Sequence, residues 1–223
     1  MISPSNEEEV LSEQENQNAE HSIQIDEQTN SNHSIQIKKE IFRKSIHLCS
    51  ALLPFLLSLF YWPIIFLLCL TLVLYIGFES VRLKGKTIPL VSKITEFASR
   101  ERDKNKFVLG PVTLVLGIVL SAILWRGNAL SIGIYALSFG DGLASLGGKL
   151  FGKKTLPFTN GKTLAGSLTC FFAVFCTTFL VSKNLIVSLV CAFASMIVEV
   201  LPLADFDNLV IPVLIGGLAN FLL

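Results

Sequence analysis

Seven apolar stretches dominate the sequence after residue 44, and they restrict the chain to folds that can bury such stretches. A transmembrane helix needs about 20 apolar residues, with about 17 as the lower limit. The stretches cover residues 45–61, 63–79, 107–125, 128–147, 164–182, 184–201 and 209–223. We therefore predict an all-α transmembrane bundle of about seven spans. A break at Tyr61-Trp62-Pro63 divides the first two stretches and the last is short, so six spans or a re-entrant hairpin are the alternatives.

The first 40 residues differ in character from the rest of the chain. The whole sequence is 52% hydrophobic and 16% charged, which argues against a soluble fold. Residues 1–40 carry acidic side chains such as Glu7, Glu8 and Glu9 but almost no aliphatic runs. Such a segment cannot bury a core, so we expect a disordered acidic tail at 1–40 and a membrane domain at 41–223. No signal-peptide pattern accompanies the first apolar stretch, so we expect that stretch to stay in the membrane.

Lysine and arginine are distributed unevenly among the loops between the stretches. If the amino terminus is cytoplasmic, every Lys and Arg except Arg126 and Lys183 lies on the cytoplasmic side. Basic residues mark that side because translocating a cationic segment is costly. Tyr61, Trp62 and Trp125 then fall at the opposite interface, where aromatic anchors gather. We predict a cytoplasmic amino terminus and, with seven spans, a carboxyl terminus on the other side.

The long loop at 81–106 has a helical pattern of its own. Its apolar residues Val91, Ile94, Phe97 and Ala98 recur at helical spacing between charged residues. We expect an interfacial helix along the cytoplasmic surface.

The densest group of polar residues begins inside the fourth stretch. Asp141 lies well within apolar sequence, between Gly140 and Gly142. The lysines that follow it are Lys149, Lys153, Lys154 and Lys162. A carboxylate can hold Mg²⁺, while lysines and backbone N–H groups can hold phosphate oxygens. The pattern predicts a site for a Mg²⁺-bound polyphosphate.

Simpler explanations account for part of this group. Gly148-x-x-x-Gly152 is a common helix-packing pattern, and lysines after a span follow from a cytoplasmic orientation. Neither explains Asp141. Gly161-Lys162-Thr163 matches only the end of a P-loop, because Leu156 stands where the first glycine is needed and no βαβ context exists. A Walker-type ATPase is therefore excluded.

Two further polar groups lie at predicted cytoplasmic ends of spans. Glu79 and Arg82 are three residues apart, so they would lie on one helix face and could pair. They are candidate site residues, and the simpler alternative is that they form an ion pair at the membrane interface that only closes the helix. The turn between the last two spans carries Glu199, Asp207 and Asn208 and no lysine. These residues are candidate metal or hydroxyl ligands, although Asp and Asn are also ordinary turn residues.

Together these motifs resemble the CTP-dependent lipid-alcohol kinases, a membrane family that includes dolichol kinase, phytol kinase and yeast-type diacylglycerol kinase. The resemblance runs from about Arg43 to the carboxyl terminus, and the acidic tail has no counterpart. It rests on Arg43-Lys-x-x-His47, Glu79-x-x-Arg82, Asp103-Lys104 with Gly110-Pro111, Gly140-Asp-Gly-x-Ala144 with Gly152-Lys, Gly161-Lys-Thr-x-Ala-Gly-Ser167, and Glu199 with Asp207-Asn208.

The resemblance implies transfer of the γ-phosphoryl group of CTP to the hydroxyl of a lipid alcohol such as a polyprenol, phytol or diacylglycerol. It implies Mg²⁺ at Asp141, Asp207 and Asn208, with the hydroxyl proton accepted by Asp141 or Glu199. The implied phosphate-binding residues are Gly140, Gly142, Lys149, Lys153, Lys154, Lys162 and Thr163. Further candidates for the site are Glu79, Arg82, Asp103 and Lys104. No nucleic-acid partner is expected.

Two other functions would use similar residues. A cytidylyltransferase would condense CTP with a phospholipid acid and release pyrophosphate. A transporter would bind ions at Asp141 and Glu199, but transporters commonly contain paired repeats. The spans show no internal repeat and the polar residues gather toward one face, so the transporter ranks last.

Overall fold

The structure of the chain is a computed structural model that describes residues 35, 37–85, 106–152, 154–157, 159 and 161–223. The chain divides into two compact units, Met1–Glu40 and Ile41–Leu223. Nearly all of the predicted tail and the predicted interfacial helix at 91–98 lie outside the described residues, as do the candidate site residues Asp103, Lys104 and Lys153.

The described residues form helices and, apart from one isolated β-bridge between Thr155 and Thr163, no strand pairing. Four helices are long and apolar enough to cross a membrane: Ile37–Leu59, Tyr61–Leu83, Gly127–Phe151 and Leu164–Ser182. The shorter apolar helices are Gly110–Leu124, Leu185–Val200 and Asp207–Leu222. Each predicted apolar stretch corresponds to one of these helices, which confirms the all-α membrane fold.

Two of the spans are composite. The first contains a helical segment at 37–49, the 3₁₀ turn η1 (Ser50–Leu52) and α2 (Leu53–Leu59). The central span contains α6 (Gly127–Tyr135), the π-helical segment η3 (Ala136–Asp141) and α7 (Gly142–Phe151). The remaining helices are α3 (Tyr61–Leu83), α5 (Gly110–Leu124), α8 (Leu164–Ser182), α9 (Leu185–Val200) and α10 (Asp207–Leu222).

The first span begins earlier than the apolar pattern indicates. Its helix starts at Ile37, inside the segment expected to be tail, and continues through Lys38, Lys39 and Glu40 before the first apolar stretch begins. Hydrophobic patterning marks the lipid-buried part of a helix, whereas polar turns at its end carry no such mark.

The helix boundaries follow from local chemistry. Phe60 leaves helical geometry between α2 and α3, and Pro63 then stands in the first turn of α3, where its missing N–H costs nothing. The Thr163 hydroxyl caps α8 by accepting a hydrogen bond from the Gly166 N–H at 3.2 Å. The Asn184 side chain caps α9 in the same way.

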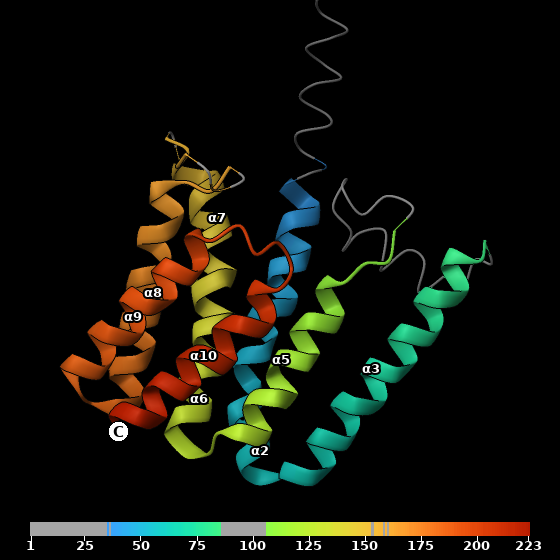
Figure 1. The fold of residues 1–223 in the computed structure, drawn as a ribbon, viewed down its shortest axis with the longest axis horizontal. Helices are drawn as coiled ribbons and strands as arrows, with labels where there is room; N and C mark the ends of the chain where they lie inside the picture. The colour runs from blue at the N-terminus through green and yellow to red at the C-terminus, as the bar shows by residue number, and fades with distance from the viewer. Residues whose placement is uncertain (1–34, 36, 86–105, 153, 158, 160) are drawn as a thin grey trace, which may run out of the picture. The chain divides into compact units, whose positions relative to one another are not determined.

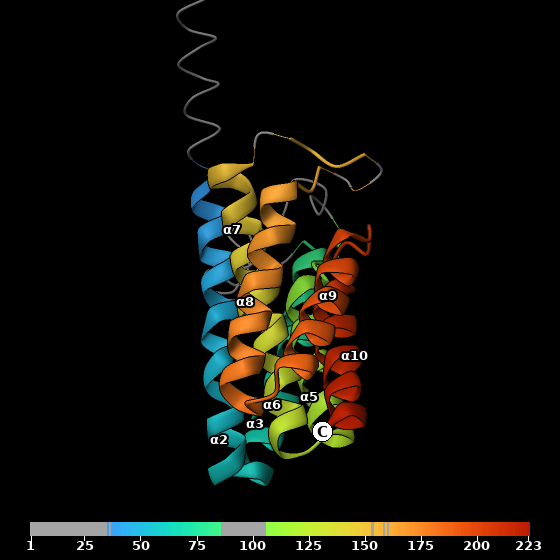
Figure 2. The ribbon, with the colours of Figure 1, turned by 90° about the vertical axis from the view of Figure 1, so that its left-hand side faces the viewer.

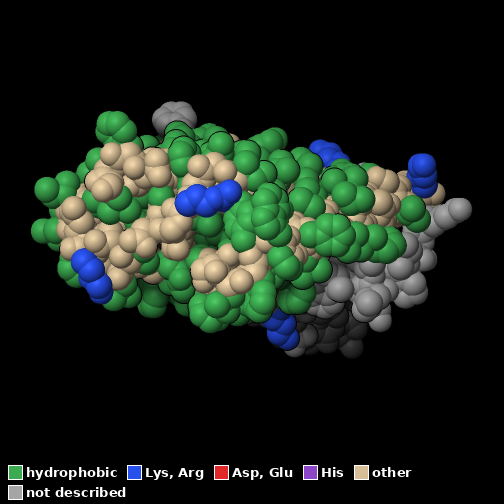
Figure 3. All heavy atoms as spheres, turned by 90° about the horizontal axis from the view of Figure 1, so that it is seen from below, with side chains coloured by type: hydrophobic (Ala, Val, Ile, Leu, Met, Phe, Trp, Pro, Cys, Tyr) green, Lys and Arg blue, Asp and Glu red, His purple; other side chains and the backbone are tan. Residues whose placement is uncertain are grey.

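Consecutive spans run in opposite directions. As a result α3, α7 and α9 finish at the end of the bundle where α5, α8 and α10 begin, which is the upper end in Figure 1 and Figure 2. The opposite end, seen in Figure 3, shows mainly hydrophobic and uncharged side chains with scattered Lys and Arg side chains. The central span is mostly buried, whereas almost all of α3 lies on the outside of the bundle.

Glycine allows the carboxyl-terminal helix to approach the centre of the bundle closely. A Cβ atom added to Gly133 in α6 would lie 2.4 Å from the backbone oxygen of Pro212, inside α10. Pro212 is itself fully buried. In a membrane, helices associate largely through such close packing of small residues, because lipid is as apolar as the side chains it replaces.

We expect Gly133→Ala to destabilise the bundle by about 1–3 kcal/mol, because the added methyl group meets backbone that cannot rotate away. Thermal unfolding in detergent measures this change. The matched control is Gly77→Ala in α3, where an added Cβ meets nothing within 4 Å, and we expect no loss of stability there. Equal unfolding temperatures for Gly133→Ala and the unmodified protein would contradict the packing described for α6 and α10.

Candidate functional site

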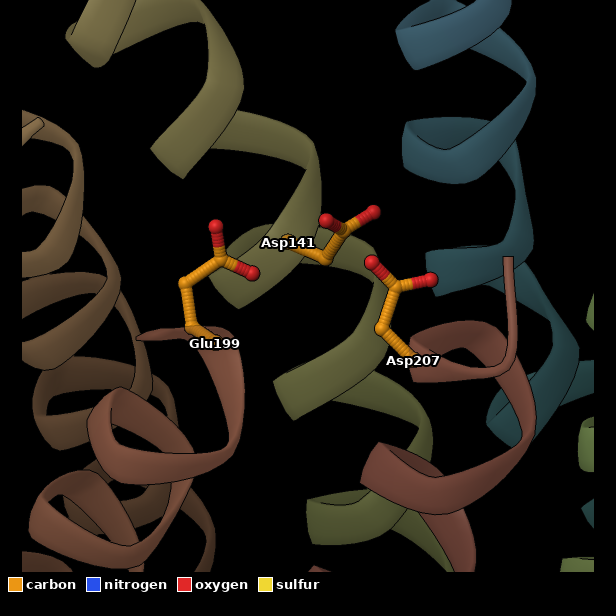
Figure 4. Close-up of side chains that lie close together, drawn as sticks. All are labelled: Asp141, Glu199 and Asp207. Atoms are coloured by element: carbon orange, nitrogen blue, oxygen red, sulfur yellow. The ribbon is translucent and has the colours of Figure 1, made fainter. Parts of the chain in front are cut away.

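Three buried carboxylates from different parts of the sequence meet where α9 ends and α10 begins, beside the middle of the central span. Asp141 ends η3 in the central span, Glu199 lies near the end of α9, and Asp207 is the first residue of α10. One oxygen of each carboxylate lies within 4.8 Å of the others. Figure 4 shows the three side chains pointing toward one another. We call Asp141, Glu199 and Asp207 the carboxylate cluster.

A π-helical segment presents Asp141 to the cluster. The segment Ala136–Asp141 interrupts an otherwise α-helical span, and Asp141 is its last residue. A π-helical turn inserts an extra residue into the helix and changes which side chains face a neighbour, and such turns are frequent at functional sites. The residues of this segment are almost all buried, so the change occurs inside the protein rather than at its lipid surface.

Two residues of the first span contact Asp141. The ammonium group of Lys44 lies 2.5 Å from Oδ2 of Asp141 and donates a hydrogen bond to it. Nδ1 of His47 lies 3.1 Å from the same oxygen, without the alignment of a hydrogen bond. Both side chains are buried. One oxygen of Asp141 is thus held by the first span.

Sequence reasoning did not place Lys44 or His47 among the site residues. The signal was present, because the two residues are three positions apart at the start of a span and both belong to the motif Arg43-Lys-x-x-His47. Lysines at the end of a span are ordinarily explained by topology alone. Burial of Lys44 against Asp141 distinguishes it from such a lysine.

Lys162 provides the second positive charge. Its Nζ lies 3.4 Å from Oε1 of Glu199 and also donates to the backbone carbonyl of that residue. The other oxygen, Oε2 of Glu199, is buried and has no hydrogen-bond partner among the described residues. An unsatisfied buried carboxylate oxygen is costly, so its position in the cluster indicates a missing partner.

Asp207 and Asn208 begin α10 against α5. Oδ1 of Asp207 accepts a hydrogen bond from the Asn208 N–H at 2.9 Å. The Asn208 side-chain amide donates to the Gly110 carbonyl at 3.4 Å and to the Thr113 hydroxyl at 3.3 Å. Asn208 therefore fixes the start of α10 to the first turn of α5.

The cluster fits a divalent cation. Within the described part of the chain, Lys44 contacts Asp141 and Lys162 contacts Glu199, and one oxygen of each of the three carboxylates lies within 4.8 Å of the others. Hard cations such as Mg²⁺ take oxygen ligands, mostly carboxylates, and would offset the repulsion among the three. The cluster contains two of the three residues expected from the sequence to hold Mg²⁺, Asp141 and Asp207, together with Glu199. The third, Asn208, donates its side-chain amide to Gly110 and Thr113 instead. Binding of Mg²⁺ stays a prediction.

The glycines beside Asp141 have differing surroundings. A Cβ at Gly140 would meet Val174 of α8 at 2.8 Å, whereas one at Gly142 would have ordinary contacts with Leu48. Close packing against α8 is enough to require glycine at 140. Gly148 and Gly152 likewise lie against Thr163, in agreement with the packing alternative for that pair.

The remaining candidate residues in the described part of the chain are Lys149, Lys154, Thr163, Glu79 and Arg82. Lys149 and Lys154 are exposed at the upper end of the bundle. The Thr163 hydroxyl is used as the helix cap of α8. Glu79 and Arg82 form the predicted ion pair, with Arg82 Nη2 2.7 Å from Glu79 Oε1. Their hydrogen bonds to the rest of the described chain go to the backbone just before α5 and not to the cluster.

Comparison with known proteins gives several similar sequences. The chain is 32% identical over 141 residues to a chloroplastic farnesol kinase of Arabidopsis thaliana, a match that covers 56% of this chain and 46% of that protein. It is 32% identical over 139 residues to a probable phytol kinase 1 of Glycine max, covering 57% and 43% of the two chains. It is 27% identical over 151 residues to phytol kinase 1 of Arabidopsis thaliana, covering 60% and 45%.

The chain spans slightly less than half the length of these three relatives. No family model matches it, and no solved structure matches it. The resemblance to lipid-alcohol kinases that the motifs indicate therefore extends to similarity with farnesol and phytol kinases.

A cation bound by the cluster should stabilise the fold in a way that depends on all three carboxylates. We expect Mg²⁺ to raise the unfolding temperature of the purified protein, because a ligand at 100 times its Kd contributes about 2.7 kcal/mol. In Asp207→Asn this rise should be lost, because the substitution removes one of the three carboxylates of the cluster.

The matched control for this experiment is Asp205→Asn, the same chemical change in the same turn at a residue outside the cluster. It should keep the Mg²⁺-dependent rise. An equal rise in Asp207→Asn and Asp205→Asn would show that Mg²⁺ acts elsewhere.

Proposed function

We propose that the protein is an integral-membrane lipid-alcohol kinase that transfers the γ-phosphoryl group of a nucleoside triphosphate, CTP, to the hydroxyl of a lipid alcohol. The observation that carries the proposal is the cluster of three buried carboxylates inside a bundle of apolar helices. Similarity to a farnesol kinase and to phytol kinases supports the same function. The choice of CTP rests on the resemblance of the motifs to the CTP-dependent family.

Phosphoryl transfer requires positioning and neutralisation of charge more than covalent chemistry by the protein. We assign Asp141 and Asp207 to hold Mg²⁺, which when bound offsets the negative charge of the phosphates. The Asn208 side-chain amide donates hydrogen bonds to Gly110 and Thr113 of α5, so Asn208 is assigned to hold Asp207 in place. Lys44 is assigned to fix the orientation of Asp141.

The phosphates are assigned to the basic residues around the cluster. Lys162 already contacts Glu199 and is the first candidate. Further candidates are the lysines that follow the central span in the sequence, Lys149, Lys153 and Lys154, with the backbone at Gly140 and Gly142 and the α8 start at Thr163. Helix amino termini favour anions because their N–H groups point outward, and α8 begins at Leu164, two residues after Lys162.

The proposed reaction is a single displacement. The lipid hydroxyl oxygen forms a bond to the γ-phosphorus, the bond from that phosphorus to the β–γ bridging oxygen breaks, and its electron pair leaves with the nucleoside diphosphate. The hydroxyl proton passes to Glu199, whose Oε2 has no hydrogen-bond partner among the described residues. Asp141 is the alternative acceptor, but one of its oxygens already contacts Lys44.

The location of the cluster suits two substrates of opposite character. A lipid alcohol presents its hydroxyl at headgroup depth with its apolar tail among the acyl chains, and the cluster lies at the ends of helices with apolar exteriors. A nucleotide approaches from water. By the positive-inside rule we assign the amino terminus and this end of the bundle to the cytoplasm, with the carboxyl terminus on the other side.

The test uses purified protein in detergent with Mg²⁺ and a panel of farnesol, phytol, dolichol and diacylglycerol. We expect label from γ-labelled CTP to enter the organic phase with at least one alcohol, and label from α-labelled CTP to stay in water. Transfer of the α-label would indicate a cytidylyltransferase. Failure of both, with ion flux into liposomes, would indicate a transporter.

The variant Asp141→Asn tests the role of Asp141 in the site without an expected effect on the fold. We expect this variant to insert into membranes normally and to lose at least about 100-fold in turnover, as removal of a directed charge from a catalytic site commonly does. Asp205→Asn is the matched control and should retain activity. Full activity of Asp141→Asn would remove Asp141 from the proposed site.

A further inference from the structure

Glu79 is a fully buried carboxylate outside the carboxylate cluster. It lies near the end of α3 and has no exposed surface. Its oxygens accept hydrogen bonds from Nε and Nη2 of Arg82, each at 2.7 Å, and from the backbone N–H of Val108 at 2.9 Å. A buried ion pair contributes little net stability because desolvation offsets the attraction. In a membrane helix, such a pair calls for another explanation.

The contacts of this pair converge on the backbone just before α5. Arg82 Nη2 donates to the Lys106 carbonyl at 2.8 Å. The Tyr75 hydroxyl donates to the Val108 carbonyl at 3.1 Å, so side chains of α3 hold both the N–H and the C=O of Val108. Tyr75 also packs edge-on against Phe107. The start of α5 is thereby tied to the end of α3.

The first turn of α5 in turn holds the start of α10. The Gly110 carbonyl and the Thr113 hydroxyl accept the hydrogen bonds of the Asn208 amide, and Asn208 donates its own N–H to Asp207. One turn further along α5, a Cβ at Gly117 would lie 2.4 Å from the backbone oxygen of Asn208, so the two helices touch through their backbones. A shift of α5 would be passed directly to Asp207.

We infer that Glu79 and Arg82 are positioning residues that set the place of Asp207 in the cation site through the first turn of α5. The inference rests on the proposed function for the cation site, and it assigns the pair a role without contact to substrate. Metal ligands depend on the groups that orient them, and loss of such a group typically weakens metal binding by about 10–100-fold.

The experiment measures Mn²⁺ affinity by electron paramagnetic resonance on the full chain in detergent. Glu79→Gln keeps the shape of the side chain and an acceptor for Val108 but loses the two-pronged pairing with Arg82. We expect it to bind Mn²⁺ about 10-fold more weakly than the unmodified protein. Arg82→Lys, which keeps the charge without the planar fork, should change the affinity in the same direction.

Tyr61→Phe is the matched control. The Tyr61 hydroxyl donates to the Ala122 carbonyl at 2.8 Å, so this variant also removes a hydrogen bond between α3 and α5, but near the opposite end of α5. It should lower the unfolding temperature slightly and leave Mn²⁺ affinity unchanged. A purely structural role for Glu79 predicts the same pattern in Glu79→Gln, and that result would overturn the inference.

Activity provides a second readout that separates this inference from the proposed function. If Glu79→Gln weakens Mn²⁺ binding and the unmodified protein transfers no phosphoryl group, the positioning role stands and the kinase proposal fails. If the unmodified protein is active and both Glu79→Gln and Arg82→Lys bind Mn²⁺ normally, only the positioning role fails. Absence of Mn²⁺ binding in the unmodified protein overturns both. If Glu79→Gln does not fold, Arg82→Lys decides.

Discussion

Asp141, Glu199 and Asp207 bring three carboxylates together inside a bundle whose outer surface is apolar, so their repulsion has to be offset within the protein. Two unit charges about 4 Å apart interact by about 4 kcal/mol at an effective dielectric constant of about 20. Lys44 and Lys162 supply part of the compensation through their contacts with Asp141 and Glu199. A divalent cation among the three would supply the rest.

The charged residues of this site come from several segments that are far apart in the sequence. The first span contributes Lys44, the central span turns Asp141 inward through a π-helical segment, and the α9–α10 turn contributes the other two carboxylates. The loop before α8 contributes Lys162. Spans that alternate in direction bring these segments together.

Much of the fold could be predicted because a membrane permits few solutions. Backbone groups in lipid have to be satisfied within each segment, so apolar runs become helices. The break predicted at Tyr61-Trp62-Pro63 lies one residue earlier, at Phe60 between α2 and α3. The same cost drew attention to Asp141 and Glu199, since a carboxylate within a span requires a partner. The structure places both residues close to Asp207, while their chemical roles stay predictions.

Other features could not be predicted for identifiable reasons. Sequence order does not say which helices touch, so the contacts of Lys44 and His47 with Asp141 required the three-dimensional arrangement. A π-helical segment has no residue pattern that separates it from an α-helix. Glycine next to Asp141 suggested close approach of a ligand, but at Gly140 the close neighbour is Val174 of α8. The polar start of the first helix at Ile37 lacks an apolar signal.

The most direct test of the account is a structure of the protein determined with Mn²⁺, in which anomalous scattering locates the ion. The account predicts one peak between Asp141, Glu199 and Asp207, about 2–2.6 Å from at least two of their oxygens, the range of ordinary hard-cation contacts. Carboxylates bonded directly to one another or to lysine, with no peak among them at saturating Mn²⁺, would contradict it.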